Sequence, residues 1–148
     1  MARSHFGKLK PRYRFALNPF PDVRWSRCPN CEKLMHVRKF PLLLHLGGTT
    51  LLTLGLTCRY CTPCEFIIAH QHELELEIAI FRDQHPDVRV DDLFVVGTVD
   101  RETWKRSLGM RGGLSLEELR EQTSDIKDHR VLNDPSRTWI RSAPNEAA

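Results

Sequence analysis

All five cysteines of this chain lie between residues 28 and 64, in two groups. The first group is Cys28 and Cys31, and the second holds Cys58, Cys61 and Cys64. Two Cys-x-x-Cys pairs separated by a few tens of residues are typical of a structural zinc site, where four thiolates surround one ion at about 2.3 Å. The sequence therefore predicts one structural Zn²⁺ as the cofactor.

Five cysteines are one too many for a tetrahedral site, so the second pair is either Cys58 with Cys61 or Cys61 with Cys64. The residues 62–65 favour the latter, because they read as a helix start with a threonine N-cap, a proline at the first position and a glutamate completing a capping box. Cys64 would then lie in the first helical turn, where the helix dipole favours a thiolate. Cys58 is left as a strand thiol or a spare ligand. The predicted ligands are Cys28, Cys31, Cys61 and Cys64.

Disulfides and a redox dithiol are the alternative uses of these cysteines. Disulfides need an oxidising compartment, whereas residues 1–8 contain no apolar signal region, so the sequence predicts a cytoplasmic protein. A redox Cys-x-x-Cys is expected near a βαβ pattern, which this region lacks. Structural zinc is therefore the stronger interpretation.

The order of the predicted elements resembles that of treble-clef zinc fingers over about residues 25–84: a Cys-x-x-Cys turn, a hairpin, then a second Cys-x-x-Cys entering a helix. Across the whole chain, the segments Arg38–Leu42, Cys58–Cys61 and Gly97–Arg101 resemble small, uncharacterised bacterial zinc-ribbon-like proteins. The treble-clef resemblance implies the metal and the fold, and the whole-chain resemblance implies the metal and a cytoplasmic location. Neither implies an activity, because such fingers serve many roles.

Alternating leucines on both sides of a glycine pair predict a β-hairpin over residues 32–57. A three-residue loop, Gly47–Gly48–Thr49, would give the hairpin one leucine-rich face. The following helix is expected to run from Thr62 to about Gln84, before Pro86. It carries two apolar stripes on roughly opposite sides, so we expect it to be covered on both. Ile67, Leu74, Ile78 and Phe81 form one stripe, and Ala69, Leu76 and Ile80 form the other.

Three further elements are expected after Pro86. Residues 93–96 have the apolar, β-branched composition of a buried strand. Asp100 is placed to cap a short helix through Leu108, and residues 115–118 form a capping box that opens a helix through about His129.

The predicted fold class is therefore α+β: a small four-cysteine zinc finger made of a knuckle, a β-hairpin and a long helix, with an added strand and one or two short helices. The expected organisation is a basic aromatic arm over 1–24, a zinc-finger core over 25–85 and an extension packed on that core over 86–132. The polar tail, 133–148, is expected to be disordered.

Charge is unevenly distributed, although the formal net charge is only +3. Residues 1–40 carry +8, residues 41–100 carry −6 and residues 101–148 carry +1. In the first segment Lys8, Lys10, Arg12 and Arg14 are interleaved with aromatic residues, a mixture that suits phosphates and bases. The sequence thus predicts a nucleic-acid-binding arm. The alternative is an arm that packs its aromatic residues on the finger and leaves its charges solvated.

A protein-interaction or homodimerisation module is the second functional hypothesis, because the two-sided helix would suit a partner. A membrane span is not expected, because the uncharged run 40–58 is barely long enough and contains Pro41, His45 and two glycines. An enzyme is less favoured, because four thiolates close a zinc site and the sequence has no phosphate loop or nucleophile elbow. His70 and His72 would point about 200° apart on a helix, so they cannot share one ion.

Overall fold

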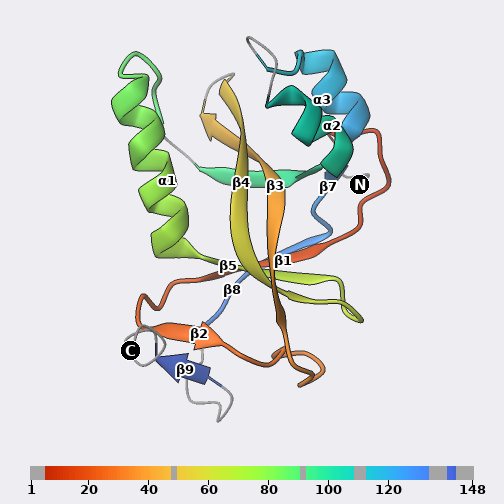
Figure 1. The fold of residues 1–148 in the computed structure, drawn as a ribbon, viewed down its shortest axis with the longest axis vertical. Coiled ribbons are helices and arrows are strands. Elements are labelled where there is room, and N and C mark those ends of the chain that lie inside the picture. Colours follow the sequence, from red (N-terminus) through yellow and green to blue (C-terminus); the bar gives the residue numbers. More distant parts are fainter. Residues whose placement is uncertain (1–5, 48–49, 91–92, 109–112, 134–139, 143–148) are drawn as a thin grey trace, which may run out of the picture. The chain divides into compact units, whose positions relative to one another are not determined.

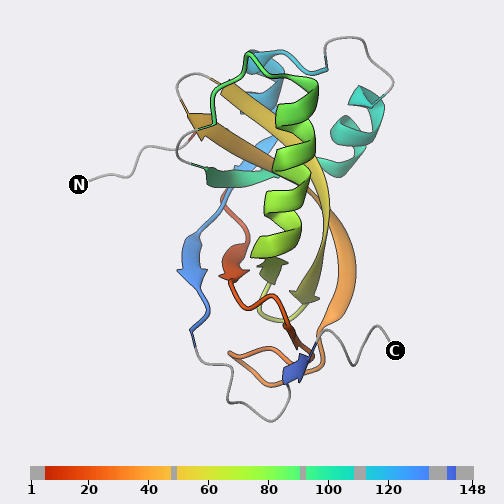
Figure 2. The same ribbon diagram turned by 90° about the vertical axis from the view of Figure 1, so that its left-hand side faces the viewer.

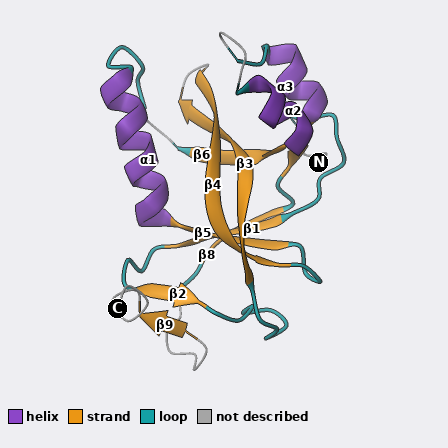
Figure 3. Ribbon diagram, in the orientation of Figure 1, coloured by secondary structure: helices purple, strands orange, loops and turns teal. Residues whose placement is uncertain are grey.

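The computed structural model describes residues 6–47, 50–90, 93–108, 113–133 and 140–142. In this part of the chain strands account for 44% of the residues and helices for 23%, so the protein is rich in β-structure (Figure 3). The elements are β1 (Arg14–Asn18), β2 (Val23–Trp25), β3 (His36–Gly47), β4 (Thr50–Cys61), β5 (Phe66–His70), α1 (Gln71–Gln84), β6 (Phe94–Val99), α2 (Arg101–Ser107), α3 (Leu116–Gln122), β7 (Thr123–Asp125), β8 (Asp128–Val131) and β9 (Ile140–Ser142).

Seven strands are hydrogen-bonded in the order β7-β6-β3-β4-β5-β1-β8, and β2 pairs separately with β9. Strand β1 lies between β5 and β8 and is parallel to both (Figure 1). Strands β4 and β5 are antiparallel, as are β3 and β6. The chain forms two compact units, each assembled from three separate stretches.

Unit 1 comprises residues 1–13, 40–56 and 87–127. Its buried cluster joins Leu43 of β3, Val99 of β6 and Trp104 of α2 with Leu119 of α3. Both predicted helix starts are confirmed: Asp100 accepts the N–H of Thr103 at 3.0 Å, and residues 115–118 form a capping box. The last helix ends at Gln122 rather than near His129, because residues 123–125 pair with β6 as strand β7.

Residues 6–8 of unit 1 are held by hydrogen bonds from their backbone N–H groups. The N–H groups of Phe6 and Gly7 donate to the carboxylate of Asp125 at 2.9 and 2.7 Å, and that of Lys8 donates to a backbone carbonyl at 2.7 Å. A Cβ at Gly7 would lie 2.0 Å from the carbonyl oxygen of Thr123, so the position requires glycine. Further along the predicted basic aromatic arm, residues 14–18 form β1 and residues 23–25 form β2.

Unit 2 comprises residues 14–39, 57–86 and 128–148. Its apolar cluster includes Trp25 of β2, Cys61 of β4 and both Phe66 and Ile68 of β5. Strands β2 and β9 lie side by side in two views (Figures 1 and 2). Within the tail that was expected to be disordered, residues 140–142 form β9; residues 134–139 and 143–148 lie outside the described residues.

The long helix expected from Thr62 is wrong, and the predicted fold class is wrong with it. Residues 66–70 form the strand β5, buried along its whole length between β4 and β1, and α1 begins only at Gln71. Phe66 and two isoleucines follow the cap signal, and aromatic and β-branched residues favour a strand. The structure thus has a seven-stranded sheet where a small zinc finger containing a long helix was expected. Cys64 precedes a strand and does not enter a helix as it would in a treble clef.

From residue 40 onward strand β3 is largely buried on both faces, whereas one leucine-rich face was expected. Leu42, Leu43 and Leu44 are all fully buried, and successive side chains of a strand point to opposite faces of the sheet, so both faces are covered here. Gly47 has a φ of +113°, which fits the glycine requirement at this end of the strand. Residues 48–49 of the predicted loop lie outside the described residues.

Helix α1 is covered along one stripe and not along two. Leu74 and Ile78 are buried, whereas Leu76 and Ile80 are 51% and 52% exposed. In the portion of the chain that the structure describes, no helix is long and apolar enough to cross a membrane.

Candidate metal centre

The first cysteine turn is closed by backbone hydrogen bonds on both sides. The N–H of Glu32 donates to the carbonyl of Cys28 at 2.8 Å, and the N–H of Cys28 donates to the carbonyl of Lys33 at 2.8 Å. Glu32 has a φ of +66°, which reverses the chain directly after Cys31. The turn thereby presents both of its thiols on one side.

The second turn repeats this geometry at the end of β4. Cys61 closes the strand, Cys64 follows after Thr62 and Pro63, and Glu65 has a φ of +49°. The N–H of Glu65 donates to the carbonyl of Thr62 at 3.2 Å. The residue after each Cys-x-x-Cys is thus a glutamate in a left-handed conformation, a position that favours glycine.

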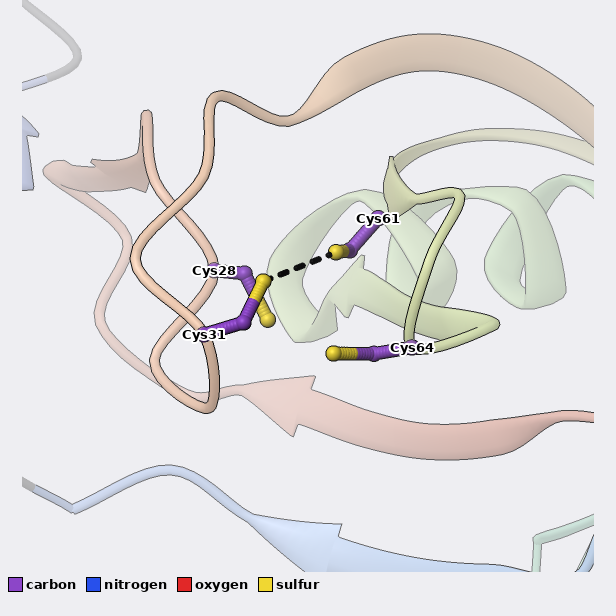
Figure 4. Close-up of side chains that lie close together, drawn as sticks. All are labelled: Cys28, Cys31, Cys61 and Cys64. Carbon is purple, nitrogen blue, oxygen red and sulfur yellow. Dashed lines mark hydrogen bonds between the residues drawn. The ribbon is translucent and has the colours of Figure 1, made fainter.

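The four thiols of the two turns converge on one point (Figure 4). The Sγ atoms of Cys28, Cys31, Cys61 and Cys64 all lie within 4.8 Å of one another, and those of Cys31 and Cys61 are 3.5 Å apart. A ZnS₄ tetrahedron with bonds of about 2.3 Å has S–S edges of about 3.8 Å. The arrangement is therefore a suitable tetrahedral site for one structural zinc ion.

Cys58 does not belong to this cluster. It lies three residues before Cys61 in β4, so the alternation of a strand places the two side chains on opposite faces. The side chain is only 3% exposed, and its burial together with the negative charge of Glu73 raises the pKa of the thiol. Strand geometry thus explains why Cys64, and not Cys58, completes the set.

Asn30, in the first turn, contacts a cysteine of each turn and was not identified from the sequence. Its backbone N–H donates to Sγ of Cys28 at 3.3 Å, and its side-chain Nδ2 donates to Sγ of Cys64 at 3.2 Å. Such donors stabilise thiolates and orient metal ligands. Its place between the first two cysteines was the available signal, since N–H groups of a Cys-x-x-Cys turn face the sulfurs.

The thiols differ in how readily they ionise. A hydrogen bond from the backbone of Lys33 lowers the pKa of Cys31 to about 7. Desolvation raises the pKa of Cys61 to about 12 and also raises that of Cys28. Because zinc binds thiolates, its binding must displace the protons of these two buried thiols.

An apolar shell surrounds the buried side of the cluster. Trp25, Met35, Phe66 and Ile68 pack with Cys28 and Cys61, and both of these cysteines are fully buried. Four thiols fill a tetrahedral shell, and an apolar surrounding keeps water away from it. The site therefore has the character of a structural rather than a catalytic metal centre.

The four basic residues predicted to contact nucleic acid are all exposed, but their aromatic neighbours are not all available. Lys8, Lys10, Arg12 and Arg14 lie at the surface. Tyr13 and Phe15 are buried, at 7% and 2% exposure, and cannot stack on bases. The guanidinium of Arg12 lies 4.7 Å from the centre of the Tyr13 ring.

Comparison of the chain with protein-family models, with curated proteins and with solved structures gave no match.

Proposed function

We propose that this protein is a non-enzymatic zinc-binding module that binds nucleic acid through its basic N-terminal residues. In this proposal Cys28, Cys31, Cys61 and Cys64 bind one structural Zn²⁺. The convergence of four thiols from two turns that are 30 residues apart, from Cys31 to Cys61, is the observation that carries the zinc assignment. A full tetrahedral shell leaves no open coordination position for a substrate, which supports a structural role.

Native mass spectrometry of the purified chain tests the metal. We expect one zinc ion per chain, which Cys58→Ala retains and Cys61→Ala loses. The two variants are matched, because both remove a buried thiol from β4. Zinc retained in Cys61→Ala, or no zinc in the unaltered protein, would contradict the assignment.

The exposure of Lys8, Lys10, Arg12 and Arg14 supports the nucleic-acid proposal. Exposed basic side chains can contact the phosphates of a nucleic-acid backbone. Because Tyr13 and Phe15 are buried, we expect contacts to phosphates to dominate and sequence preference to be weak.

Salt-dependent binding to duplex DNA tests this part of the proposal. Replacing all four residues with glutamine should reduce the magnitude of the slope of log K against log salt concentration by about 3.6, because each phosphate contact contributes about 0.9. A matched control removes four other exposed charges, at Arg82, Arg101, Lys105 and Arg106. Equal effects of the two quadruple variants would show that net charge, and not this segment, is responsible.

Homodimerisation is a second candidate, favoured by the exposed apolar pair Leu76 and Ile80 on α1. The two residues are one helical turn apart and form a short stripe. Sedimentation at increasing concentration should show a dimer that the double change Leu76→Ser and Ile80→Ser abolishes. A monomer at all concentrations would exclude it.

A further inference from the structure

Unit 2 contains a half-open cavity of about 150 Å³ that the proposed function does not use. One face of the sheet provides part of its lining. Asn18 of β1 pairs with His70 of β5, and Ile68 of β5 pairs with Arg59 of β4, so these four residues share a face. An apolar cavity of about 150 Å³ accommodates benzene, so this one has room for a ligand of about six heavy atoms.

The cavity lies at the N-terminus of α1. His70 is the N-cap of this helix, and its side chain makes no capping hydrogen bond to the described residues. Glu73, in the first turn, also lines the cavity. The N-terminus of a helix carries a partial positive charge and N–H groups without helical partners, so it favours a negatively charged group.

Two buried polar atoms of the lining residues have no hydrogen-bond partner in the part of the chain that the structure describes. They are Nε1 of Trp25 and Nδ1 of His70. Trp25 is only 2% exposed and His70 only 6%. Nε2 of His70 lies 3.1 Å from the carbonyl oxygen of Pro21, which can only accept, so Nε2 carries the proton. In the neutral ring Nδ1 is therefore an acceptor, whereas the Trp25 indole is a donor. A buried donor or acceptor without a hydrogen-bond partner costs free energy of folding, so both atoms favour a ligand that bonds to them.

The charged residues of the lining give it a positive balance. Arg24 and Arg59 line the cavity together with one carboxylate, Glu73. The guanidinium of Arg24 lies 2.7 Å from Oε2 of Glu73, and the two side chains are 22% and 42% exposed. Glu73 thus holds Arg24 through a contact that another carboxylate can replace.

We propose that this cavity binds a small carboxylate that also carries a hydroxyl group. Its carboxylate takes the place of Glu73 beside Arg24 and accepts the indole N–H of Trp25, while its hydroxyl donates to Nδ1 of His70. Both nitrogen atoms are covered in the structure. Binding in this proposal therefore includes a movement of the side chains that cover these two atoms.

Three probes of similar size test the carboxylate and the hydroxyl group separately. Lactate carries both groups, propanoate lacks the hydroxyl, and lactamide lacks the negative charge. Each is titrated into the full-length, zinc-loaded protein, and the indole N–H signal of Trp25 is followed by NMR after assignment with Trp25→Phe. We expect saturable binding of lactate, weaker binding of propanoate and the weakest binding of lactamide. No saturable shift with any probe would overturn the proposal.

Two variants should change lactate affinity in opposite directions. Arg59→Gln removes a cation of the lining and should weaken binding by about tenfold or more. Glu73→Gln removes the competing carboxylate and should tighten binding severalfold. Arg82→Gln, an exposed change elsewhere on α1, is the control and should have no effect. A shift that both lining variants leave unchanged would mean an adventitious additive only, and would also overturn the proposal.

Discussion

At the scale of single residues, Asn30 links the two cysteine turns through hydrogen bonds that do not involve a metal. It is exposed, yet its amide donates to Sγ of Cys64, and its backbone N–H donates to Sγ of Cys28. One residue of the first turn thus contacts a ligand from each turn. Donors of this kind fix the direction of a thiolate lone pair.

Asn30→Ala should therefore weaken zinc binding while leaving the fold intact. The loss of one hydrogen bond to a thiolate is expected to lower zinc affinity by about tenfold, the lower end of the effect of such supporting groups. Competition with a chromophoric chelator measures the affinity. Asn133→Ala, another exposed asparagine, is the control. An unchanged affinity in Asn30→Ala would show that the amide does not support the ligand.

His70 makes stability depend on pH. Its burial, followed by the positive charge of Arg24, lowers its pKa below the ordinary value of 6.5. Between these two pKa values the unfolded chain binds more protons than the folded chain, so the free energy of unfolding falls as the pH falls below 6.5. The contribution of His70 is complete above that value.

His70→Gln should reduce this pH dependence, because glutamine keeps a donor for the carbonyl of Pro21 but does not titrate. Urea unfolding of both proteins, zinc-loaded and at several pH values on each side of 6.5, measures the slope. Loss of zinc in acid affects both proteins, so the difference between their slopes isolates His70. Parallel curves would contradict the prediction.

At the scale of elements, the two cysteine turns are a repeated unit in which a glutamate has the conformation of a glycine. The φ values of Glu32 and Glu65 are +66° and +49°. A left-handed conformation costs a residue with a Cβ about 1–2 kcal/mol, part of which glycine recovers.

Glu32→Gly should therefore stabilise the zinc-loaded protein by up to about 1 kcal/mol. Glu77→Gly, on the exposed side of α1, should destabilise it by about 1 kcal/mol, because glycine is unfavourable within a helix. Urea unfolding of the two variants provides a test with opposite signs. Destabilisation by both would mean that the side chain of Glu32 outweighs its backbone strain.

The sequence identified the cysteine cluster but not the fold around it. The spacing of two Cys-x-x-Cys pairs is a local property, and the selection of Cys64 over Cys58 agrees with the structure. The helix start that favoured Cys64 is nevertheless not formed, because residues 62–65 form a turn before a strand. The strand β5 depends on parallel pairing with β1, about 50 residues earlier in the chain. No local pattern reveals such a partner.

The same limit explains the other missed features. Asn30, the Asp125 contacts to Phe6 and Gly7, and the cavity beside His70 all join residues far apart in the sequence. Helix caps were predictable, because Asp100 and Ser115 act within four residues. Features formed by residues close together in the sequence were therefore predictable, and features formed by residues far apart were not.

At the scale of the whole molecule, the chain has two cores of different chemistry. The core of unit 1 joins apolar side chains such as Leu43, Val99 and Leu119. The core of unit 2 includes Cys28 and Cys61, both of them candidate ligands. Metal binding free energy contributes directly to the stability of such a core, whereas the first core is held by apolar burial.

Chelation of zinc should therefore loosen unit 2 before unit 1. With EDTA present, hydrogen exchange followed by mass spectrometry should accelerate first in peptides covering residues 25–35 and 57–70, which contain both cysteine turns and β5. Peptides covering residues 94–107 and 115–125 should keep most of their protection, because Asp100 and Ser115 cap their helices and Asp125 holds the N-terminal segment without a metal. Re-addition of zinc should restore the slow exchange. Equal acceleration throughout the chain would show that the two cores unfold as one cooperative structure, and no acceleration would show that the thiols do not depend on a metal.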